Sequence, residues 1–482
     1  MLQNKKSVGK NYIYNLIYEI FMLIVPVAIT PYVSRVLGEE GSGQYSYIYS
    51  IVTYFTLFAA LGFGKYAQRL VAQHQCDKYK QSVDFWEVIL ARLVSVLMAI
   101  FVYIVLMKLE VYGEKYNILV LIFTINIIAV AFDITFFFQG NEEFKIMVFR
   151  NIVVKTIGFI CIFIFVKSSQ DLWKYTLIQS LMIVLSNLSL WMYLPRYLEK
   201  ISWHDIHPIQ HIVPTLFLFL PTIAVSIYTS LDKTLIGLIT KDDAENGNYE
   251  YAEKIVKMAL TVITSLGTVM IPRNSQQFAN GKFESVKKNI ENSLRFVMLA
   301  GIPMMLGLMA VADNMIPWYL GGGYDKAANL IKILSPIIVI IGFSNVLGLQ
   351  YLLPSGADKE FTIAIITGAV TNFILNCILI RYTGSYGAAV ATVIAESVVT
   401  IVMFGYVKEK ISLKNILFST WKYLLAGMTM FLFCKILSLN LSSSLLHTLV
   451  IIGVGVCIYG IMLVILRDEY LRNIIKKYIG KK

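Results

Sequence analysis

Two tyrosine phrases, each followed by an arginine, repeat along the chain. The sequence reads GQYSY from Gly43 and GNYEY from Gly247, and at the same spacing each phrase is followed by an arginine, Arg69 or Arg273. An arginine guanidinium binds a phosphate or carboxylate through two parallel hydrogen bonds. Two arginines at equivalent places in a repeat predict a paired anion site, and simple anchoring at a membrane surface is the alternative.

Further ionisable side chains lie inside long apolar runs, where a charge at mid-depth costs about 2.5 to 3.5 kcal/mol. Such groups usually face a polar cavity or a partner. The candidates for binding an anionic, hydroxyl-rich ligand are Arg92, Lys155, Lys254, Lys257, Arg295, Asn372 and Asn376. The candidates for binding a coupling ion, H⁺ or Na⁺, are Glu19, Asp133 and Glu396.

These candidates also have structural interpretations. Glu253 lies four residues before Lys257 and could neutralise it as a helical ion pair. Asp133 or Glu396 could be bonded to a cation on a neighbouring helix. Asn372 and Asn376 are one helical turn apart, and hydrogen bonding between helices is the commoner role of such residues.

The elements that must position these residues are membrane-spanning helices. Apolar residues make up 57% of the 482 positions and charged residues only 15%, a composition typical of an integral membrane protein. About fourteen apolar runs are long enough to span a bilayer, at about 20 residues each. Lys and Arg are more frequent in the tails and even-numbered connections, which places both termini in the cytoplasm. The net charge of +12 therefore reflects topology and attraction to anionic lipids, and not nucleic acid binding.

A second pair of phrases supports an internal repeat. FFQGNEEF begins at Phe137 and LPSGADKEF begins at Leu353, at an offset similar to that of the tyrosine phrases. We predict two parallel six-helix lobes, 1–200 and 201–410, and an appended helix pair with a basic cytoplasmic tail, 411–482. Prolines in the first helix of each lobe mark either hinges or static kinks: Pro26, Pro31, Pro214 and Pro221.

Other motifs predict no metal, cofactor or catalytic site. The five cysteines form no CxxC pair. His204, His207 and His211 are interrupted by Pro208, which would disturb a helix aligning them for a metal. GxSxG and HExxH are absent from the sequence.

Several phrases together resemble the Wzx-type polysaccharide flippases of the multidrug/oligosaccharidyl-lipid/polysaccharide exporter superfamily. They are RVLGEEGSGQYSY from Arg35, LDKTLIGLI from Leu231, VMIPR from Val269, LSPIIVIIGFSNVLGLQYLLPSGADKEF from Leu334 and GSYGAAVATVIAE from Gly384. The resemblance implies a MATE-like fold in a bacterial inner membrane. It also implies alternating-access transport of undecaprenyl-diphosphate-linked oligosaccharide units to the periplasmic face, with polysaccharide polymerase or chain-length machinery as further partners.

Two other functions are weighed against this one. A drug-exporting antiporter of the same superfamily would share the lobes, but it would normally have twelve spans and an acidic cavity for cations. The thirteenth and fourteenth predicted spans and the basic interior count against it. A membrane polysaccharide polymerase or acyltransferase would need a large outer loop for catalytic groups, and the longest outer connection expected here, 232–248, is short and acidic.

Overall fold

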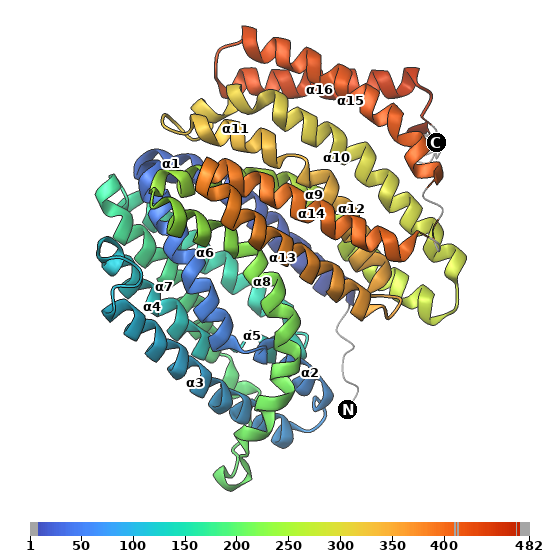
Figure 1. Cartoon of the computed structure of the whole chain (residues 1–482). Coiled ribbons are helices and arrows are strands. Elements are labelled where there is room, and N and C mark those ends of the chain that lie inside the picture. The colour runs from blue at the N-terminus through green and yellow to red at the C-terminus, as the bar shows by residue number, and fades with distance from the viewer. Residues whose placement is uncertain (1–7, 409–410, 412–413, 469, 473–482) are drawn as a thin grey trace. The chain divides into compact units, whose positions relative to one another are not determined.

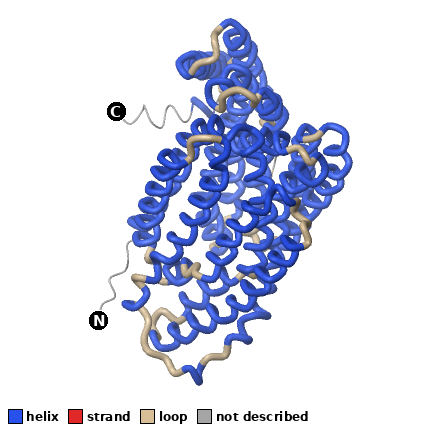
Figure 2. Tube along the Cα trace, turned by 90° about the vertical axis from the view of Figure 1, so that its left-hand side faces the viewer, coloured by secondary structure: helices blue, strands red, loops and turns tan. Residues whose placement is uncertain are grey.

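The structure of the chain, a computed structural model, is helical. It describes the backbone of residues 8–408, 411, 414–468 and 470–472, without the side chains of 8–20, 22–24, 217–218, 220–229 and 414–419. Helices joined by short loops make up the described residues, which include no strand (Figure 2). The predicted all-α architecture is confirmed, and each helix satisfies its own backbone hydrogen bonds within a bilayer.

The chain divides into two compact units, Met1–Thr234 and Leu235–Lys482. The first unit contains α1 (Val8–Ala60), α2 (Phe63–Gln73), α3 (Lys78–Lys108), α4 (Asn117–Ala131), α5 (Thr135–Gly140), α6 (Phe144–Phe165), α7 (Leu172–Trp191) and most of α8 (Ile212–Thr240). The second contains the end of α8, α9 (Asp243–Ala279), α10 (Phe283–Tyr319), α11 (Asp325–Leu334), α12 (Ile337–Leu347), a π-helix (Gly348–Leu352), α13 (Asp358–Thr383), α14 (Ser385–Val407), α15 (Lys414–Asn440) and α16 (Leu445–Ile465) (Figure 1). Short 3₁₀ helices join some of these, at Glu114–Tyr116, Ser169–Asp171, Leu194–Arg196, Trp203–Asp205 and Pro208–His211.

Twelve segments of the described chain are long and apolar enough to cross a membrane. The differences from the predicted count lie in α1 and α8. α1 runs through both of the first two predicted spans, with a kink at Gly38 (φ 69°), whereas Pro26 and Pro31 lie inside the helix without such a break. α8 coincides with the seventh predicted span, but many of its central side chains lie outside the described residues.

The repeated tyrosine phrase makes the same contact in both units. Tyr47 of α1 packs edge-on against Tyr116, with ring centres 5.3 Å apart, and Tyr251 of α9 packs edge-on against Tyr324 at 5.3 Å. Tyr116 and Tyr324 are the N-cap residues of α4 and α11. All four side chains are buried. Each phrase therefore marks an equivalent interior contact, worth about 0.5 to 1.5 kcal/mol beyond the area it buries.

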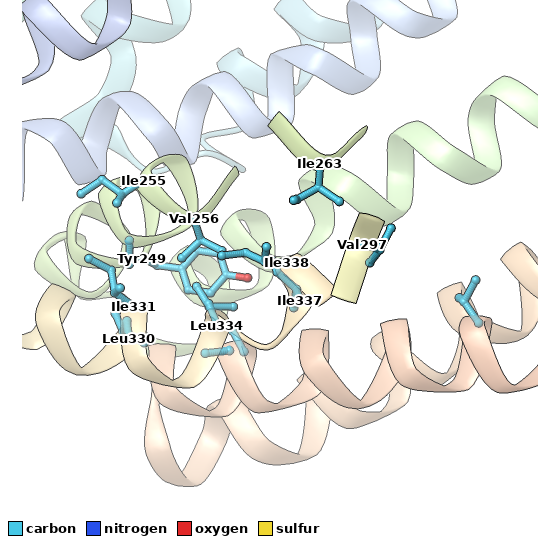
Figure 3. Packing of buried hydrophobic residues seen from close by; sticks show 14 of the residues in the cluster. Tyr249, Ile255, Val256, Ile263, Val297, Leu330, Ile331, Leu334, Ile337 and Ile338 are labelled. Atoms are coloured by element: carbon cyan, nitrogen blue, oxygen red, sulfur yellow. The ribbon is translucent and has the colours of Figure 1, made fainter. Parts of the chain in front are cut away.

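The phrase also supplies the core of the second unit. Figure 3 shows the fully buried ring of Tyr249 among apolar side chains that include Val256 of α9, Leu334 of α11 and Ile337 of α12. Its hydroxyl hydrogen-bonds to Thr392 Oγ1 of α14 at 3.1 Å. Tyr249 thus joins α9 to α11, α12 and α14. The predicted lobe boundaries stay predictions, because a compact unit need not end where a repeat ends.

Small residues allow α13 and α14 to form a close antiparallel pair (Figure 1). The chain turns between them at Gly384, which has φ 60°. The backbone N–H of Ser385, at the start of α14, donates a hydrogen bond to Glu245 Oε2 at 2.8 Å, and a carboxylate is favourable at a helix N-terminus. Gly387 follows, packed directly against the backbone of Leu379 and Ile380. The GSYGAAV phrase is therefore explained by this turn and close approach.

Within the first unit, α8 packs closely against the chain at Gly62. Gly62 is the N-cap of α2 with φ 76°, a left-handed conformation that favours glycine. A Cβ atom there would lie 2.9 Å from the carbonyl oxygen of Thr215 and 3.2 Å from the backbone nitrogen of Phe219, both in α8. Any side chain at position 62 would therefore meet backbone that cannot rotate away.

Replacing Gly62 with alanine should destabilise the first unit. The left-handed backbone and the contact with Thr215 together should cost about 1 to 3 kcal/mol, which lowers the unfolding temperature of the purified protein in detergent. Gly64→Ala is the matched control, because nothing lies within 4 Å of a Cβ atom at that position. Equal unfolding temperatures for the two variants would contradict the proposed close approach.

Candidate functional site

The predicted site residues are divided between the two units. The first unit holds Arg69, Arg92, Asp133 and Lys155, and the second holds Lys254, Lys257, Arg273, Arg295, Asn372, Asn376 and Glu396. The side chain of Glu19 lies outside the described residues. The groups that can be described together are therefore those within one unit.

Arg92 and Asp133 lie near the place where the predicted span 117–138 breaks into α4 and α5. Asp133 Oδ1 accepts hydrogen bonds from the backbone N–H and the hydroxyl of Thr135, at 2.9 and 2.6 Å, and so supports the start of α5. Arg92, 3% exposed, donates from Nη2 to the carbonyl of Ala131 at 3.2 Å and interacts electrostatically with Asp133. Its guanidinium also lies 5.5 Å from the ring centre of Phe136.

The carbonyls released by this break are bonded by side chains from other helices. Asn187 Nδ2 donates to the carbonyl of Ala129 at 2.8 Å, and Trp191 Nε1 donates to that of Phe132 at 2.9 Å. A broken helix is tolerated at membrane depth only when neighbouring groups satisfy its backbone in this way. Arg92 therefore serves the fold here. Its Nε atom is buried and has no hydrogen-bond partner among the described residues.

A second buried arginine in the first unit was not among the predicted residues. Arg150 of α6 is 6% exposed. Its Nη1 atom donates to the carbonyl of Ser186 in α7, and its Nη2 atom donates to Asn151 Oδ1 at 2.8 Å. The sequence feature that could have identified Arg150 was its position inside a predicted span, 146–166. Lys155, one turn further along α6, is half-buried.

In the second unit, Lys257 and Lys254 of α9 each interact with another residue of the same helix. Lys257 Nζ forms an ion pair with Glu253 Oε1 at 2.6 Å, so the structural pair foreseen from their spacing exists. The Lys257 side chain remains 44% exposed, which leaves its other donors accessible. Lys254 Nζ lies 5.8 Å from the ring centre of Tyr251, the tyrosine that packs on Tyr324.

Asn372 and Asn376 form a buried polar pair on α13. They are 1% and 0% exposed, and Asn376 Nδ2 donates to Asn372 Oδ1 at 2.9 Å. The Asn372 Nδ2 atom has no hydrogen-bond partner among the described residues. Glu396 of α14 is half-buried. The asparagine pair is thus enclosed within the second unit, and Glu396 is more accessible.

Arg295 lies near the contact of α10 with α15 and the C-terminal segment. It interacts electrostatically with Tyr423 of α15 and with Tyr470. Burial raises the pKa of the Tyr470 hydroxyl, and the positive charge of Arg295 acts in the opposite direction. Elsewhere in this unit, Lys332 and Lys435 share the single carboxylate of Asp313, so the three side chains together keep one positive charge.

Arg69 and Arg273 differ from the buried candidates, because both side chains are exposed. Arg69 lies in α2, directly after α1, and Arg273 lies near the end of α9. A cavity of 530 Å³ lies at the end of α9 within the second unit, lined by aromatic side chains such as Phe278 and by Lys287, Glu284 and Glu360. The exposed arginines are therefore accessible to a soluble anion in a way that Arg92 is not.

Comparison with known proteins decides the family. A family model described as "Polysaccharide biosynthesis protein" matches residues 8–278, more than half of the chain. The chain belongs to the polysaccharide biosynthesis protein family. This membership confirms the resemblance to polysaccharide flippases derived from the sequence phrases. A second family model, described as "Lipid II flippase MurJ", matches residues 218–458.

A curated relative of this family member covers nearly the whole chain. The protein named "Putative O-antigen transporter" from Escherichia coli (strain K12) is 25% identical over 413 residues, which are 85% of this chain and 99% of that protein. The match thus extends through both units and most of the predicted site residues.

Two solved structures share the fold of this family member. A lipid II flippase MurJ in an inward closed conformation gives a TM-score of 0.68 at 16% identity, covering 92% of this chain and 99% of the other. An inward-facing multidrug resistance MATE family transporter gives 0.65 at 15% identity, covering 85% and 96%. At these identities the likeness shows the fold alone, and it confirms the predicted MATE-like architecture.

Proposed function

We propose that this protein flips undecaprenyl-diphosphate-linked oligosaccharide units from the cytoplasmic to the periplasmic face of the bacterial inner membrane, for O-antigen, capsule or exopolysaccharide synthesis. The observation that carries the proposal is the match over 99% of a relative named as an O-antigen transporter. Membership of the polysaccharide biosynthesis protein family and the match to a lipid II flippase family model support it. The protein is accordingly a transporter and not an enzyme.

The chemistry of the candidate residues suits such a substrate. A lipid-linked oligosaccharide carries an anionic diphosphate, a polar sugar chain and an apolar tail. Exposed Arg69 and Arg273 can bind the diphosphate at the cytoplasmic mouth. The Nε atom of Arg92 is buried here, so Arg92 contacts the substrate only if transport passes through a conformation that opens the first unit. Asn372 Nδ2 is likewise buried, so it donates to sugar hydroxyls only if transport opens the second unit around it. The tail can remain in the bilayer, where lipids are its natural surroundings.

Alternating access by the two lobes is the proposed mechanism, with both termini in the cytoplasm. Coupling to H⁺ or Na⁺ through Glu19, Asp133 or Glu396 is part of the proposal, as is cooperation with polymerase or chain-length machinery. For Asp133 the coupling role competes with its contact to Thr135. A transport assay with D133N under imposed ion gradients separates these two roles.

Flipping by the purified protein is the direct test of the function. In proteoliposomes, the protein should move a short undecaprenyl-diphosphate-linked oligosaccharide to the leaflet where an added glycosidase can reach it. Deleting the gene in a host without a second flippase should abolish surface polysaccharide. Normal export after deletion would remove the proposal, and uptake of organic cations by the same vesicles would favour drug transport instead.

Replacing Arg69 and Arg273 together by lysine should lower the flipping rate by about five- to tenfold. Lysine keeps the positive charge that anchors a membrane surface, but it cannot form the paired hydrogen bonds of a guanidinium. Arg381→Lys is the matched control, because Arg381 is exposed at the end of α13 on the predicted outer side. An unchanged rate in the double variant would show that the two arginines only anchor the protein.

A further inference from the structure

A buried polar cluster in the first unit joins α2, α3 and the segment that leads into α8. Glu87 of α3 is 2% exposed and His211 is 4% exposed. His211 Nε2 lies 2.6 Å from Glu87 Oε2, and His211 Nδ1 lies 2.8 Å from the hydroxyl of Tyr66 in α2. Both ring nitrogens of the histidine are therefore bonded, each to a different helix of the unit.

Glu87 is the anchor of this cluster. Besides His211, its carboxylate accepts a hydrogen bond from the backbone N–H of His207 at 2.6 Å and one from Gln210 Nε2 at 3.0 Å. All three donors come from the segment immediately before α8. These three hydrogen bonds satisfy a buried carboxylate and attach the start of α8 to α3 through Glu87.

The Tyr66 hydroxyl lets His211 hold one proton or two in the same place. When the imidazole is neutral with its proton on Nε2, Nε2–H donates to Glu87 and the tyrosine hydroxyl donates to Nδ1. When the imidazole is protonated, Nδ1–H donates to the tyrosine oxygen instead. Neither state requires a heavy atom to move. The hydrogen-bond geometry of the cluster therefore accommodates either protonation state of His211.

Other titratable groups surround the cluster. Asp84 of α3 lies close enough to interact electrostatically with His211 and with Glu87. Asp84 is itself paired with His74, the C-cap residue of α2. The titratable groups around His211 are thus two carboxylates of α3, one hydroxyl and one histidine of α2, and the neighbouring His207. The positive charge of an imidazolium would be balanced by Glu87 and Asp84.

The segment held by the cluster begins the helix that links the two compact units. α8 starts at Ile212, directly after His211, and the division between the units falls within it, at Thr234 and Leu235. One turn into α8, the backbone of Thr215 contacts Gly62. Any detachment of α8 from α2 and α3 must therefore break the cluster.

We propose that Tyr66, Glu87 and His211 form a proton-binding site that holds the start of α8 on α2 and α3 more firmly when His211 is protonated. The protonated histidine forms a charge-assisted hydrogen bond with Glu87, which is stronger than the neutral bond. Histidine is the side chain that ordinarily changes charge in the physiological pH range. The site therefore makes the attachment of the linking helix dependent on pH, whatever substrate the protein carries.

Hydrogen–deuterium exchange of the full chain in nanodiscs tests this site. The measured rates are first corrected for the effect of pH on the chemical rate of amide exchange. The backbone amides of residues 207–216 should then open about five- to tenfold less often at pH 6 than at pH 8. His211→Gln can still donate one bond to Glu87 but cannot titrate, so its opening should not depend on pH. Exchange that is equal at both pH values in the wild type would overturn the proposal.

Two further variants separate this site from its neighbours. His204→Gln is the matched control, because His204 is exposed and should leave the pH dependence unchanged. His74→Gln tests the adjacent pair with Asp84, and loss of the pH dependence in this variant but not in His211→Gln would assign the proton to His74 and overturn the proposal. Nitrogen-15 spectra of the histidine side chains in the wild type test the same titration without any substitution. These measurements are independent of flipping, so a failed transport assay would not affect them.

Discussion

Replacing Gly387 with alanine should strongly destabilise the second unit. A Cβ atom at this position would lie 2.4 Å from the carbonyl carbon of Leu379, 2.5 Å from its oxygen and 2.8 Å from the nitrogen of Ile380. These are backbone atoms of α13, so the added methyl group can be accommodated only by separating two helices. Overpacking of this kind costs typically 1 to 3 kcal/mol, and we expect about 3 kcal/mol because no side chain can move aside.

The consequence should extend beyond the helix pair. Around the same turn, Glu245 bonds the backbone N–H of Ser385 and forms an ion pair with Lys326, just after the start of α11. Separating α13 from α14 would disturb both contacts. We therefore expect a lower unfolding temperature in detergent and a reduced amount of folded protein in the membrane.

Gly405→Ala is the matched control for this change. Gly405 lies in the same helix, is exposed, and has nothing within 4 Å of the place that an added methyl group would occupy. Because alanine is the better helix former, this variant should be as stable as the wild type or slightly more stable. The same chemical change should thus have opposite effects at two positions of α14. A Gly387→Ala variant as stable as Gly405→Ala would show that the two helices are not in close contact.

Replacing Arg92 with methionine should destabilise the first unit by about 3 kcal/mol. The change would leave the Ala131 carbonyl without its side-chain donor and Asp133 without its nearby positive charge. Removing one partner of a buried charged contact typically costs 3 to 5 kcal/mol, and the lower end applies because Asp133 keeps its bonds to Thr135. The unfolding temperature in detergent measures the effect.

A double-mutant cycle tests whether Asp133 is the charge that Arg92 balances. Asp133→Asn keeps an oxygen that can accept from Thr135, so its own cost should be smaller, about 1 kcal/mol. The double variant should lose about 1 kcal/mol less than the sum of the two single variants, because the coupled charges are removed together. Arg69→Met, on an exposed residue of α2, should leave the unfolding temperature unchanged.

The alternative for Arg92 has a different outcome. If its main role were to bind substrate, Arg92→Met would lower the flipping rate while the unfolding temperature stayed the same. Equal stability of wild type and variant, together with additive effects in the cycle, would therefore contradict the structural role. Measuring rate and stability on the same preparations separates the two roles.

Much of the fold could be predicted because it depends on local composition. A run of about 20 apolar residues predicts a spanning helix wherever it occurs, and most of the structure's longer helices follow this rule without their partners being known.

The positions where helices kink or break were harder to predict. The prolines of α1 lie inside the helix, and Gly38 marks its kink. The interruption between α4 and α5 falls in an apolar run that contains no proline or glycine before Gly140.

The candidate site was predictable only as a set of residue types. The spacing of Glu253 and Lys257 on one helix was enough to predict their pairing. The surroundings of Arg92 were not predictable, because the carbonyl it bonds lies on another helix. His211 appeared in the sequence only as a poor metal ligand, since Glu87 and Tyr66 lie more than a hundred positions away along the chain.

By itself, the sequence determined that this protein is a helical membrane protein of the polysaccharide biosynthesis family, and it predicted two related parts. Hydropathy follows from each residue's own side chain, and a repeated phrase is visible without any knowledge of contacts. The tertiary structure decided what the repeated phrase does: Tyr47 packs on Tyr116, and Tyr251 packs on Tyr324. It also decided which buried charges are neutralised, because a charge in an apolar interior takes its partner from whichever helix the fold brings beside it.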